Sequence, residues 1–280
     1  MESKLQNSNI VSVNIMGGLG NQLFQIATAY SYAKKENGNL RILHITQNGN
    51  RPVYWDTLLS KIKPYLVNQI PSTLVYWTEQ YPTMYRQIPT LTERGIYLAG
   101  YLQSSKYFYD DETKSEIKAL FKPDDSLYKQ ISTKYEYLLK NKDRVIVIHA
   151  RRTDYLNHPD FHAPLTGKYY KDALELMNDK ITDPIFVLSS DDNKFWYEIK
   201  DSIPKVFNSE HFIIENETDI NTFCLLQQFE NYIMSNSTFI WWCVWLSESK
   251  NVISPKKWFG HAGPKLFDDI FEKDWTIIQY

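Results

Sequence analysis

The hydrophobic pattern in the second half of the chain switches repeatedly between short apolar runs and longer amphipathic stretches. The short runs contain few polar residues, as is typical of strands that are buried on both faces. They lie at residues 144–148, 184–188, 211–214, 232–234 and 251–253, and the helical patterns between them lie at 168–177, 192–200, 218–228 and 237–247. This alternation predicts a parallel sheet whose strands are connected by helices.

The first half opens with the same kind of pattern. An apolar run at residues 10–16 enters a glycine-rich turn, and a helical pattern follows at 22–35. A second short strand is predicted at 40–45 and a third at 95–101, inside an irregular region rich in proline, tyrosine and tryptophan. The strand-turn-helix-strand opening is typical of a doubly wound α/β unit.

A polar stretch at residues 140–143 separates the two patterns. Two amphipathic helices, predicted at 112–121 and 126–140, lead up to it. We therefore predict an α/β protein of two Rossmann-like domains that face each other across a cleft. The first domain is predicted at 1–140 and the second at 141–280, and the C-terminal tail of the second is expected to cross back over the cleft.

Composition narrows the classes of partner. The net charge is −2, with 31 basic and 33 acidic residues and no basic block, which argues against binding to nucleic acid or to a membrane surface. No apolar run reaches the roughly 18–20 residues of a membrane span, and the N-terminus lacks the apolar core of a signal peptide. Cys224 and Cys243 lie in apolar helical patterns, so we expect buried free thiols in a reducing compartment. The sequence predicts a cytoplasmic location.

The glycine-rich turn reads MGGLGNQLF at residues 16–24. Glycines between a strand and a helix let the backbone approach a phosphate, which the free N–H groups and the helix dipole stabilise. A dinucleotide site is disfavoured, because a G-x-G-x-x-G pattern that starts at Gly18 would need its third glycine at Leu23. The second predicted strand also lacks the acidic residue that binds a ribose.

The segment HARRTDYL follows the first strand of the second half. Ligands of parallel α/β sheets bind at the carboxyl ends of the strands, where His149, Arg151, Arg152 and Asp154 are expected to lie. Arginine binds phosphate through two parallel hydrogen bonds, and adjacent arginines point to different sides of an extended segment. One arginine can therefore bind a diphosphate while the other contacts Asp154 or Tyr155. The alternative is an ordinary surface ion pair between Arg152 and Asp154.

A second strand, at residues 184–188, ends in two serines followed by Asp191 and Asp192. These side chains could accept hydrogen bonds from a nucleotide base or ribose, bind a metal, or cap the next helix. A magnesium site would favour two aspartates separated by one residue, whereas these two are contiguous. We therefore expect no metal, and we predict that Asp191 contacts the base or ribose of a bound nucleotide.

A third strand end carries Ser235, Asn236, Ser237 and Thr238 at the start of a predicted helix. Backbone N–H groups, hydroxyls and the positive end of the helix dipole make this position suited to an anion, and the same residues can also cap the helix. No motif of a covalent nucleophile is present, and neither cysteine has an activating neighbour. The strand ends predict a diphosphate site rather than a covalent catalyst.

Five segments, in order along nearly the whole chain, resemble the α-1,2-fucosyltransferases of glycosyltransferase family 11. They are GGLGNQLFQ (17–25), HARRTDYL (149–156), FVLSSDD (186–192), the stretch 219–246 that contains NSTFIWW, and VISPKKW (252–258). Residues 48–140 match no motif, and acceptor specificity is expected there. The resemblance thus implies that the domain at 1–140 binds the acceptor and that the domain at 141–280 binds the donor.

The resemblance implies a GT-B fold. It also implies that fucose is transferred from GDP-fucose, with inversion, to the 2-hydroxyl of a terminal galactose-like residue of an oligosaccharide. The transfer is expected to need no metal ion and no other cofactor. The residues that it implies for the donor are Arg151 and Arg152 on the diphosphate, His149 and Asp154 beside them, Gly18, Gly20 and Asn21 along the cleft, and Ser237 and Thr238 on phosphate. The chain departs from the family pattern at Thr153, Asn231, Cys243 and Val244.

Catalysis is expected to be mainly electrostatic, with Arg151 stabilising the charge that builds up on the departing diphosphate. A carboxylate could take the proton of the acceptor hydroxyl; Asp154 is the first choice, and Asp160, His158 and His162 are its rivals. Two other functions stay open: a fucosyltransferase that forms a different linkage or acts on protein Ser/Thr, and a non-catalytic protein that binds glycans or nucleotide sugars.

Overall fold

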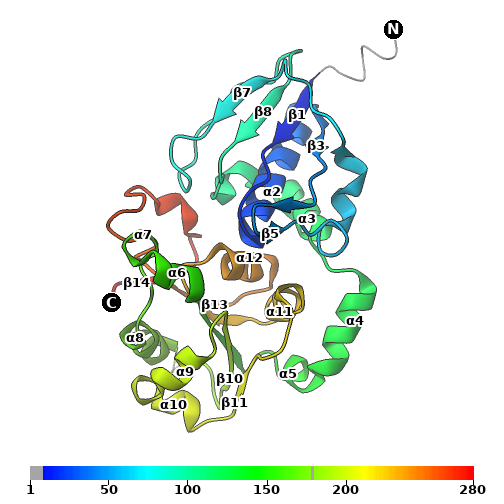
Figure 1. Ribbon diagram of the computed structural model, residues 1–280. Coiled ribbons are helices and arrows are strands. Elements are labelled where there is room, and N and C mark those ends of the chain that lie inside the picture. The colour runs from blue at the N-terminus through cyan, green and yellow to red at the C-terminus, as the bar shows by residue number, and fades with distance from the viewer. Residues whose placement is uncertain (1–8, 178–179) are drawn as a thin grey trace. The chain divides into compact units, whose positions relative to one another are not determined.

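The computed structural model describes residues 9–177 and 180–280, which form two compact units (Figure 1). One unit comprises Met1–Lys122 with Leu266–Glu272, and the other comprises Pro123–Lys265 with Lys273–Tyr280. This division differs from the predicted boundary at residue 140, because helix α4 (Asp125–Lys134) packs against helix α11 (Asp219–Leu226) of the second unit.

The first unit is built on a parallel sheet in the order β2-β1-β8-β7. Its strands are β1 (Ile10–Val13), β2 (Asn39–Leu40), β7 (Val75–Thr78) and β8 (Ile96–Ala99), with two small ladders formed by β3 (Ile42–Leu43) and β6 (Leu66–Val67) and by β4 (Gln47–Asn48) and β5 (Arg51–Pro52). The helical segments are α2 (Leu19–Lys35), α3 (Asp111–Leu120), η1 (Ser60–Tyr65), η2 (Ser105–Phe108) and η4 (Asp268–Ile270).

The second unit contains a longer parallel sheet in the order β11-β10-β9-β12-β13-β14. Its strands are β9 (Val145–Ala150), β10 (Ile185–Ser190), β11 (His211–Ile213), β12 (Asn231–Ile233), β13 (Asn251–Pro255) and β14 (Thr276–Ile278). Besides α4 and α11, its helices are α5 (Glu136–Lys140), α6 (Thr153–Asn157), α7 (Pro159–His162), α8 (Gly167–Met177), α9 (Lys194–Glu198), η3 (Lys200–Ser202), α10 (Pro204–Phe207) and α12 (Thr238–Leu246).

The strand order of the second unit reverses beside β9. The chain passes from β9 outward through β10 to β11, and then continues on the other side of β9 with β12 and β13. Such a reversal is a topological switch point, and ligands of open α/β sheets bind in the crevice outside the strand ends there. Because β9 and β10 pair in register from Val145 to Ala150, their polar carboxyl ends lie level with each other.

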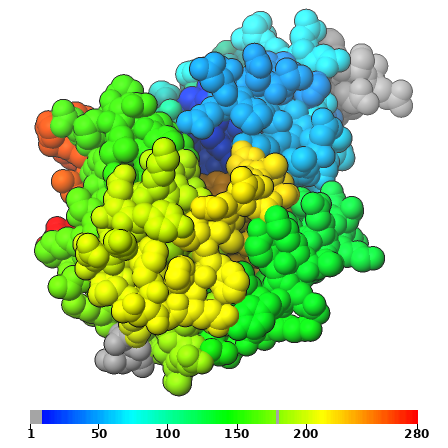
Figure 2. Space-filling view, turned by 60° about the horizontal axis from the view of Figure 1, so that its bottom comes forward, coloured from blue at the N-terminus to red at the C-terminus, as the bar shows by residue number. Residues whose placement is uncertain are grey.

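The predicted strands of the second half are confirmed, with ends that shift by one or two residues. One predicted helix, at residues 126–140, is wrong as a single element, because Tyr135 leaves the helical conformation between α4 and α5. Its hydroxyl donates to Glu217 across 2.7 Å, and Lys134 pairs with the same carboxylate. The surface of α4 adjoins the segment that leads into α11 in Figure 2.

The second unit buries its sheet between helices. Alternate residues of β9 and β10, among them Ile146, Ile148 and Phe186, lie in one core with the aromatic rings of Tyr169, Tyr170 and Trp196. Cys224 and Cys243 are buried and unpaired, as predicted. In the described part of the chain, no helix combines the length and the apolar character that a membrane crossing requires.

Candidate functional site

The ends of β9 and β12 are joined at the switch point by a buried hydrogen bond. His149 Nδ1 and Ser235 Oγ lie 2.8 Å apart, and the hydroxyl of Tyr170 donates to the His149 carbonyl across 3.1 Å. Phe239 stacks on the imidazole at a centroid distance of 5.7 Å. Burial disfavours the charged imidazole and holds the pKa of His149 well below its usual value. His149 is therefore neutral at pH 7 and adds no charge to the site.

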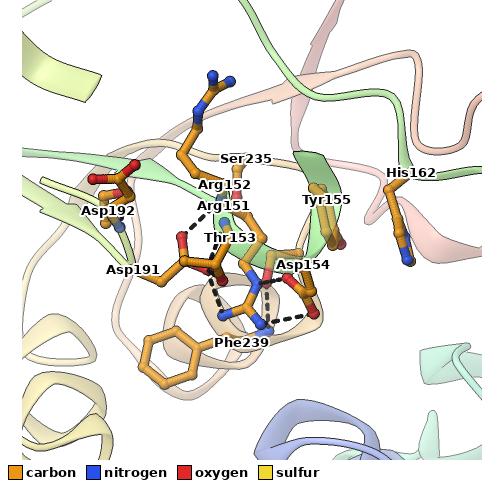
Figure 3. A network of polar contacts seen from close by, with 12 residues as sticks. Arg151, Arg152, Thr153, Asp154, Tyr155, His162, Asp191, Asp192, Ser235 and Phe239 are labelled. Atoms are coloured by element: carbon orange, nitrogen blue, oxygen red, sulfur yellow. Dashed lines mark hydrogen bonds and ion pairs between the residues drawn. The ribbon is translucent and has the colours of Figure 1, made fainter. Parts of the chain in front are cut away.

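Arg151 follows the end of β9 and is held by two carboxylates (Figure 3). Its Nε and Nη2 donate to the two oxygens of Asp154 at 2.9 and 3.0 Å, and its Nη1 lies 3.2 Å from Asp191 Oδ2. Burial would lower the pKa of Arg151, but the bonds to Asp154 and the charge of Asp191 outweigh it and the pKa is raised. A guanidinium has five N–H groups. Since Asp154 accepts from two of them and Asp191 faces a third, at most two N–H groups remain for a ligand.

Asp191 binds the backbone that follows Arg151. Its carboxylate accepts hydrogen bonds from Arg152 N at 2.7 Å, from Thr153 N at 3.2 Å and from the Thr153 hydroxyl. With the ion pair to Arg151, these contacts fix both the guanidinium and the first turn of α6. A contact of Asp191 with a donor base or ribose stays a prediction.

The side chain of Arg152 points away from that of Arg151 (Figure 3). Its guanidinium lies 4.1 Å from the ring centroid of Phe195, and its Nη1 donates to the Leu165 carbonyl across 3.0 Å. The alternative of a surface ion pair between Arg152 and Asp154 is therefore wrong, because Asp154 binds Arg151 instead. A diphosphate contact by Arg152 stays a prediction.

The third strand end is tied to two loops by Asn236. The side-chain NH₂ of this buried residue donates to the backbone carbonyls of His162 and Trp258 at 2.5 and 2.8 Å. The backbone carbonyl of Asn236 accepts from the Tyr155 hydroxyl at 2.8 Å. Ser237 caps α12, since its Oγ accepts from Phe239 N at 3.3 Å. Asn236 thus acts on loop geometry, while Ser237 and Thr238 lie at the start of α12, where the positive end of the helix dipole suits an anion.

Three predicted residues lie in the first unit, at the carboxyl end of β1. Gly18 caps α2, and its carbonyl accepts from Asn21 N at 3.0 Å. Gly20 is buried in the first turn of that helix. Gly17 has a φ of +77°, and a Cβ there would lie 2.4 Å from Asn21 Nδ2. Gly17 therefore permits a turn that a residue with a side chain would strain.

A group of buried side-chain amides lies beside this turn and was not predicted from the sequence. Gln25 accepts from Met16 N at 2.9 Å and donates to the Gly100 carbonyl at 3.2 Å. Gln103 Nε2 donates to Asn21 Oδ1 across 2.8 Å, and Gln22 donates to the Gly17 carbonyl. The available signal was two glutamines at the buried face of an otherwise apolar helix.

The rival proton acceptors lie in α7 and at His158, which directly precedes it. The ring of His162 stacks on Tyr155 at 4.3 Å, and burial lowers its pKa. Asp160 is exposed, with one oxygen 3.5 Å from His261 Nδ1.

Asn231 occupies the amino end of β12, away from the strand ends that form the site, and its amide donates to the Asp143 and Val145 carbonyls.

Within residues 9–177 and 180–280, no group of three or more His, Cys, Asp or Glu side chains is arranged to hold a metal ion. The strand ends of the second unit instead combine an oriented cation with the amino end of a helix. Such an arrangement can bind a phosphate and stabilise negative charge that develops on it.

Comparison with known proteins assigns the family. Residues 2–279 match the profile described as glycosyl transferase family 11. The chain belongs to this family. The fold resembles that of POFUT1 in a crystal structure with GDP, with a TM-score of 0.51 and 10% identity over 88% of this chain and 96% of that one. This likeness confirms the predicted GT-B fold class.

Curated relatives of this glycosyltransferase span nearly its whole length. An α-1,2-colitosyltransferase of Escherichia coli is 24% identical over 97% of this chain and 99% of its own, and the O-antigen biosynthesis glycosyltransferase WbnK of the same species is 26% identical over 91% and 97%. The galactoside α-(1,2)-fucosyltransferase 2 of Hylobates lar is 26% identical over 84% of this chain and 68% of its own.

Proposed function

We propose that this family 11 enzyme transfers L-fucose from GDP-fucose, with inversion and without a metal ion, to the 2-hydroxyl of a terminal galactose-like residue of a glycan. The observation that carries the proposal is the guanidinium of Arg151, which two carboxylates orient at the switch point and which keeps at most two N–H groups for a ligand. The α-1,2 linkage in the names of two relatives supports the regiochemistry.

The departing GDP gains negative charge on its β-phosphate as the bond to the sugar breaks. Arg151 binds that charge, and Ser237 with the amino end of α12 supplies further donors. Because these groups are fixed before the reaction, little reorganisation accompanies the charge transfer. Neutral His149 supports the site by joining the ends of β9 and β12.

Asp154 has a different role in this proposal from the one that its sequence position indicated. Both of its oxygens accept from Arg151, whose charge stabilises the carboxylate and makes it a weak proton acceptor. We therefore assign Asp154 to the orientation of the guanidinium.

A second donor sugar is favoured by one observation, the name of the colitosyltransferase relative. Colitose is fucose without its 3-hydroxyl, so the two donors share the nucleotide, the diphosphate and the leaving group. Residues that bind the diphosphate cannot distinguish them, and a contact to the 3-hydroxyl must.

The test is a donor screen with lactose as acceptor, using GDP-fucose, GDP-colitose, GDP-mannose and UDP-galactose. We expect GDP release with the first, and a product whose NMR spectrum shows an α-1,2 linkage. Preference for GDP-colitose would move the assignment to the second donor. Release from UDP-galactose alone, or from no donor, would contradict the proposal.

A further inference from the structure

Glu79 lies at the carboxyl edge of the sheet in the first unit. It follows β7 directly, and β7 pairs in register with β8, so that Glu79 lies beside the segment that leaves β8 at Gly100. This is the edge at which α/β units bind their ligands. Among the strands of this sheet, Glu79 is the only acidic residue within the three positions that follow a strand.

The loop after β8 is built around this carboxylate. Its two oxygens accept hydrogen bonds from Tyr101 N at 2.5 Å and from Leu102 N at 2.7 Å. A Cβ on Gly100 would lie 2.5 Å from Glu79 Cδ, so the approach depends on the glycine. Leu102 has a φ of +55°, a strained conformation for a residue with a side chain. Strain of this kind persists where the surroundings impose it, often at functional sites.

Glu79 differs from Asp154 in its charge environment. No Lys, Arg or His of the described residues forms an ion pair with Glu79, whereas Asp154 is bound to a guanidinium. Burial raises the pKa of Glu79 above its usual value, although the hydrogen bonds from the backbone N–H groups of Tyr101 and Leu102 act to lower it. A carboxylate without a counter-ion in a partly buried position has a higher proton affinity, which suits a general base.

The same loop also reaches the glycine-rich turn. The Gly100 carbonyl accepts from Gln25, and Gln103 donates to Asn21. Glu79 and the glycine-rich turn therefore belong to one hydrogen-bonded network at the carboxyl edge of this sheet. This edge offers amide groups for sugar hydroxyls and one carboxylate for a proton.

We propose that Glu79 is the general base of the transfer reaction. This inference rests on the proposed function. The acceptor hydroxyl gives its proton to the Glu79 carboxylate while its oxygen forms a bond to C1 of fucose. The bond between C1 and the diphosphate oxygen breaks, and its electron pair leaves with GDP. Glu79 thereby contacts the acceptor, and Arg151 acts on the leaving group.

The experiment compares two nucleophiles in wild type and in Glu79→Ala. Lactose must lose a proton to react, whereas azide is already an anion and releases GDP from GDP-fucose without a base. We expect fucosyl transfer to lactose to fall by roughly 10²- to 10⁴-fold in the variant. Azide-dependent GDP release should stay within about fivefold of wild type. Glu93→Ala, which removes an exposed carboxylate of the same unit, should leave both rates unchanged.

A purely structural role for Glu79 gives a different result. If the carboxylate only fixes the loop after β8, both nucleophiles should lose rate in parallel, and this outcome would overturn the inference. Transfer to lactose within threefold of wild type would also overturn it. Failure of wild type to use GDP-fucose with either nucleophile would instead reject the proposed function.

Discussion

Replacement of Asp191 by asparagine tests how Arg151 is positioned. The carboxylate accepts three hydrogen bonds from the backbone and hydroxyl of residues 152 and 153 and forms an ion pair with Arg151. An asparagine has a single acceptor oxygen, and its NH₂ group would face either Arg152 N–H or Thr153. At least one donor of the loop therefore loses its acceptor.

The free-energy cost of the Asp191→Asn substitution follows from the contacts that it removes. A donor left without a partner costs about 1–3 kcal/mol, and loss of the ion pair adds roughly 1 kcal/mol or less, because the Asp191 side chain is 20% exposed and partly screened. Arg151 keeps its two bonds to Asp154, so it stays in the site but is less well oriented. Misplacement by about 1 Å can lower a rate by roughly 100-fold, and we expect kcat to fall by about 10- to 100-fold.

The affinity for GDP separates this role from a direct contact with the donor. Asp191 carries a negative charge beside the guanidinium, and its removal lessens repulsion of the diphosphate. If Asp191 only positions Arg151, calorimetry should therefore show GDP binding that is unchanged or tighter while kcat falls. Asp192→Asn is the matched control, since Asp192 accepts from Lys194 N and does not contact Arg151. Weaker binding of both GDP and guanosine to Asp191→Asn would refute the positioning role.

Two further predictions concern stability. Burial lowers the pKa of His149, so protonation of this residue favours the unfolded state, and its contribution to stability is complete above pH 6.5 and is lost as the pH falls. Urea unfolding should show that His149 loses about 2 kcal/mol of this contribution between pH 7 and pH 5. The variant His149→Gln should lack this loss. A pH response identical in both proteins would contradict this reading. The substitution Asn236→Ala removes the donors to the His162 and Trp258 carbonyls, and it should lower the free energy of unfolding by about 2–3 kcal/mol in the same assay. A change below about 0.5 kcal/mol would show that water replaces the amide.

Much of the fold of the second unit could be predicted because its strands are buried on both faces. Residues 184–188 and 251–253 are apolar throughout their core positions, and only a parallel sheet covered by helices buries such runs. The observed strands β10 and β13 extend past these runs through Ser190 and Pro255, because backbone pairing continues where the apolar pattern stops.

The placement of the site residues was predictable only in part. Position at a strand end indicated that His149 and Arg151 belong to a ligand edge. The contact between Asp191 and Arg151 spans 40 positions of the sequence and arises from the register of β9 with β10, which the hydrophobic pattern does not specify. The pairing of Arg151 with Asp154 depends on the short helix α6, which was not predicted.

Glu79 could not be found from the sequence for a related reason. It lies in an irregular region where the strand β7 is short and its exposed and buried positions alternate. The feature that marks Glu79 is the absence of a Cβ at Gly100, and that absence has meaning only once β7 and β8 are paired. The division of the chain after Lys122 was missed similarly, because α4 is amphipathic whichever unit it packs against.

The central claim is that Arg151 binds the diphosphate of the donor, and calorimetry with GDP and guanosine tests it most directly. The two ligands share the base and ribose, so the ratio of their affinities reports the diphosphate alone. We predict that wild type binds GDP at least about 100-fold more tightly than guanosine, and that Arg151→Ala reduces this ratio to below about tenfold with an unchanged circular dichroism spectrum. A folded Arg151→Ala variant that keeps the full preference for GDP would contradict the account.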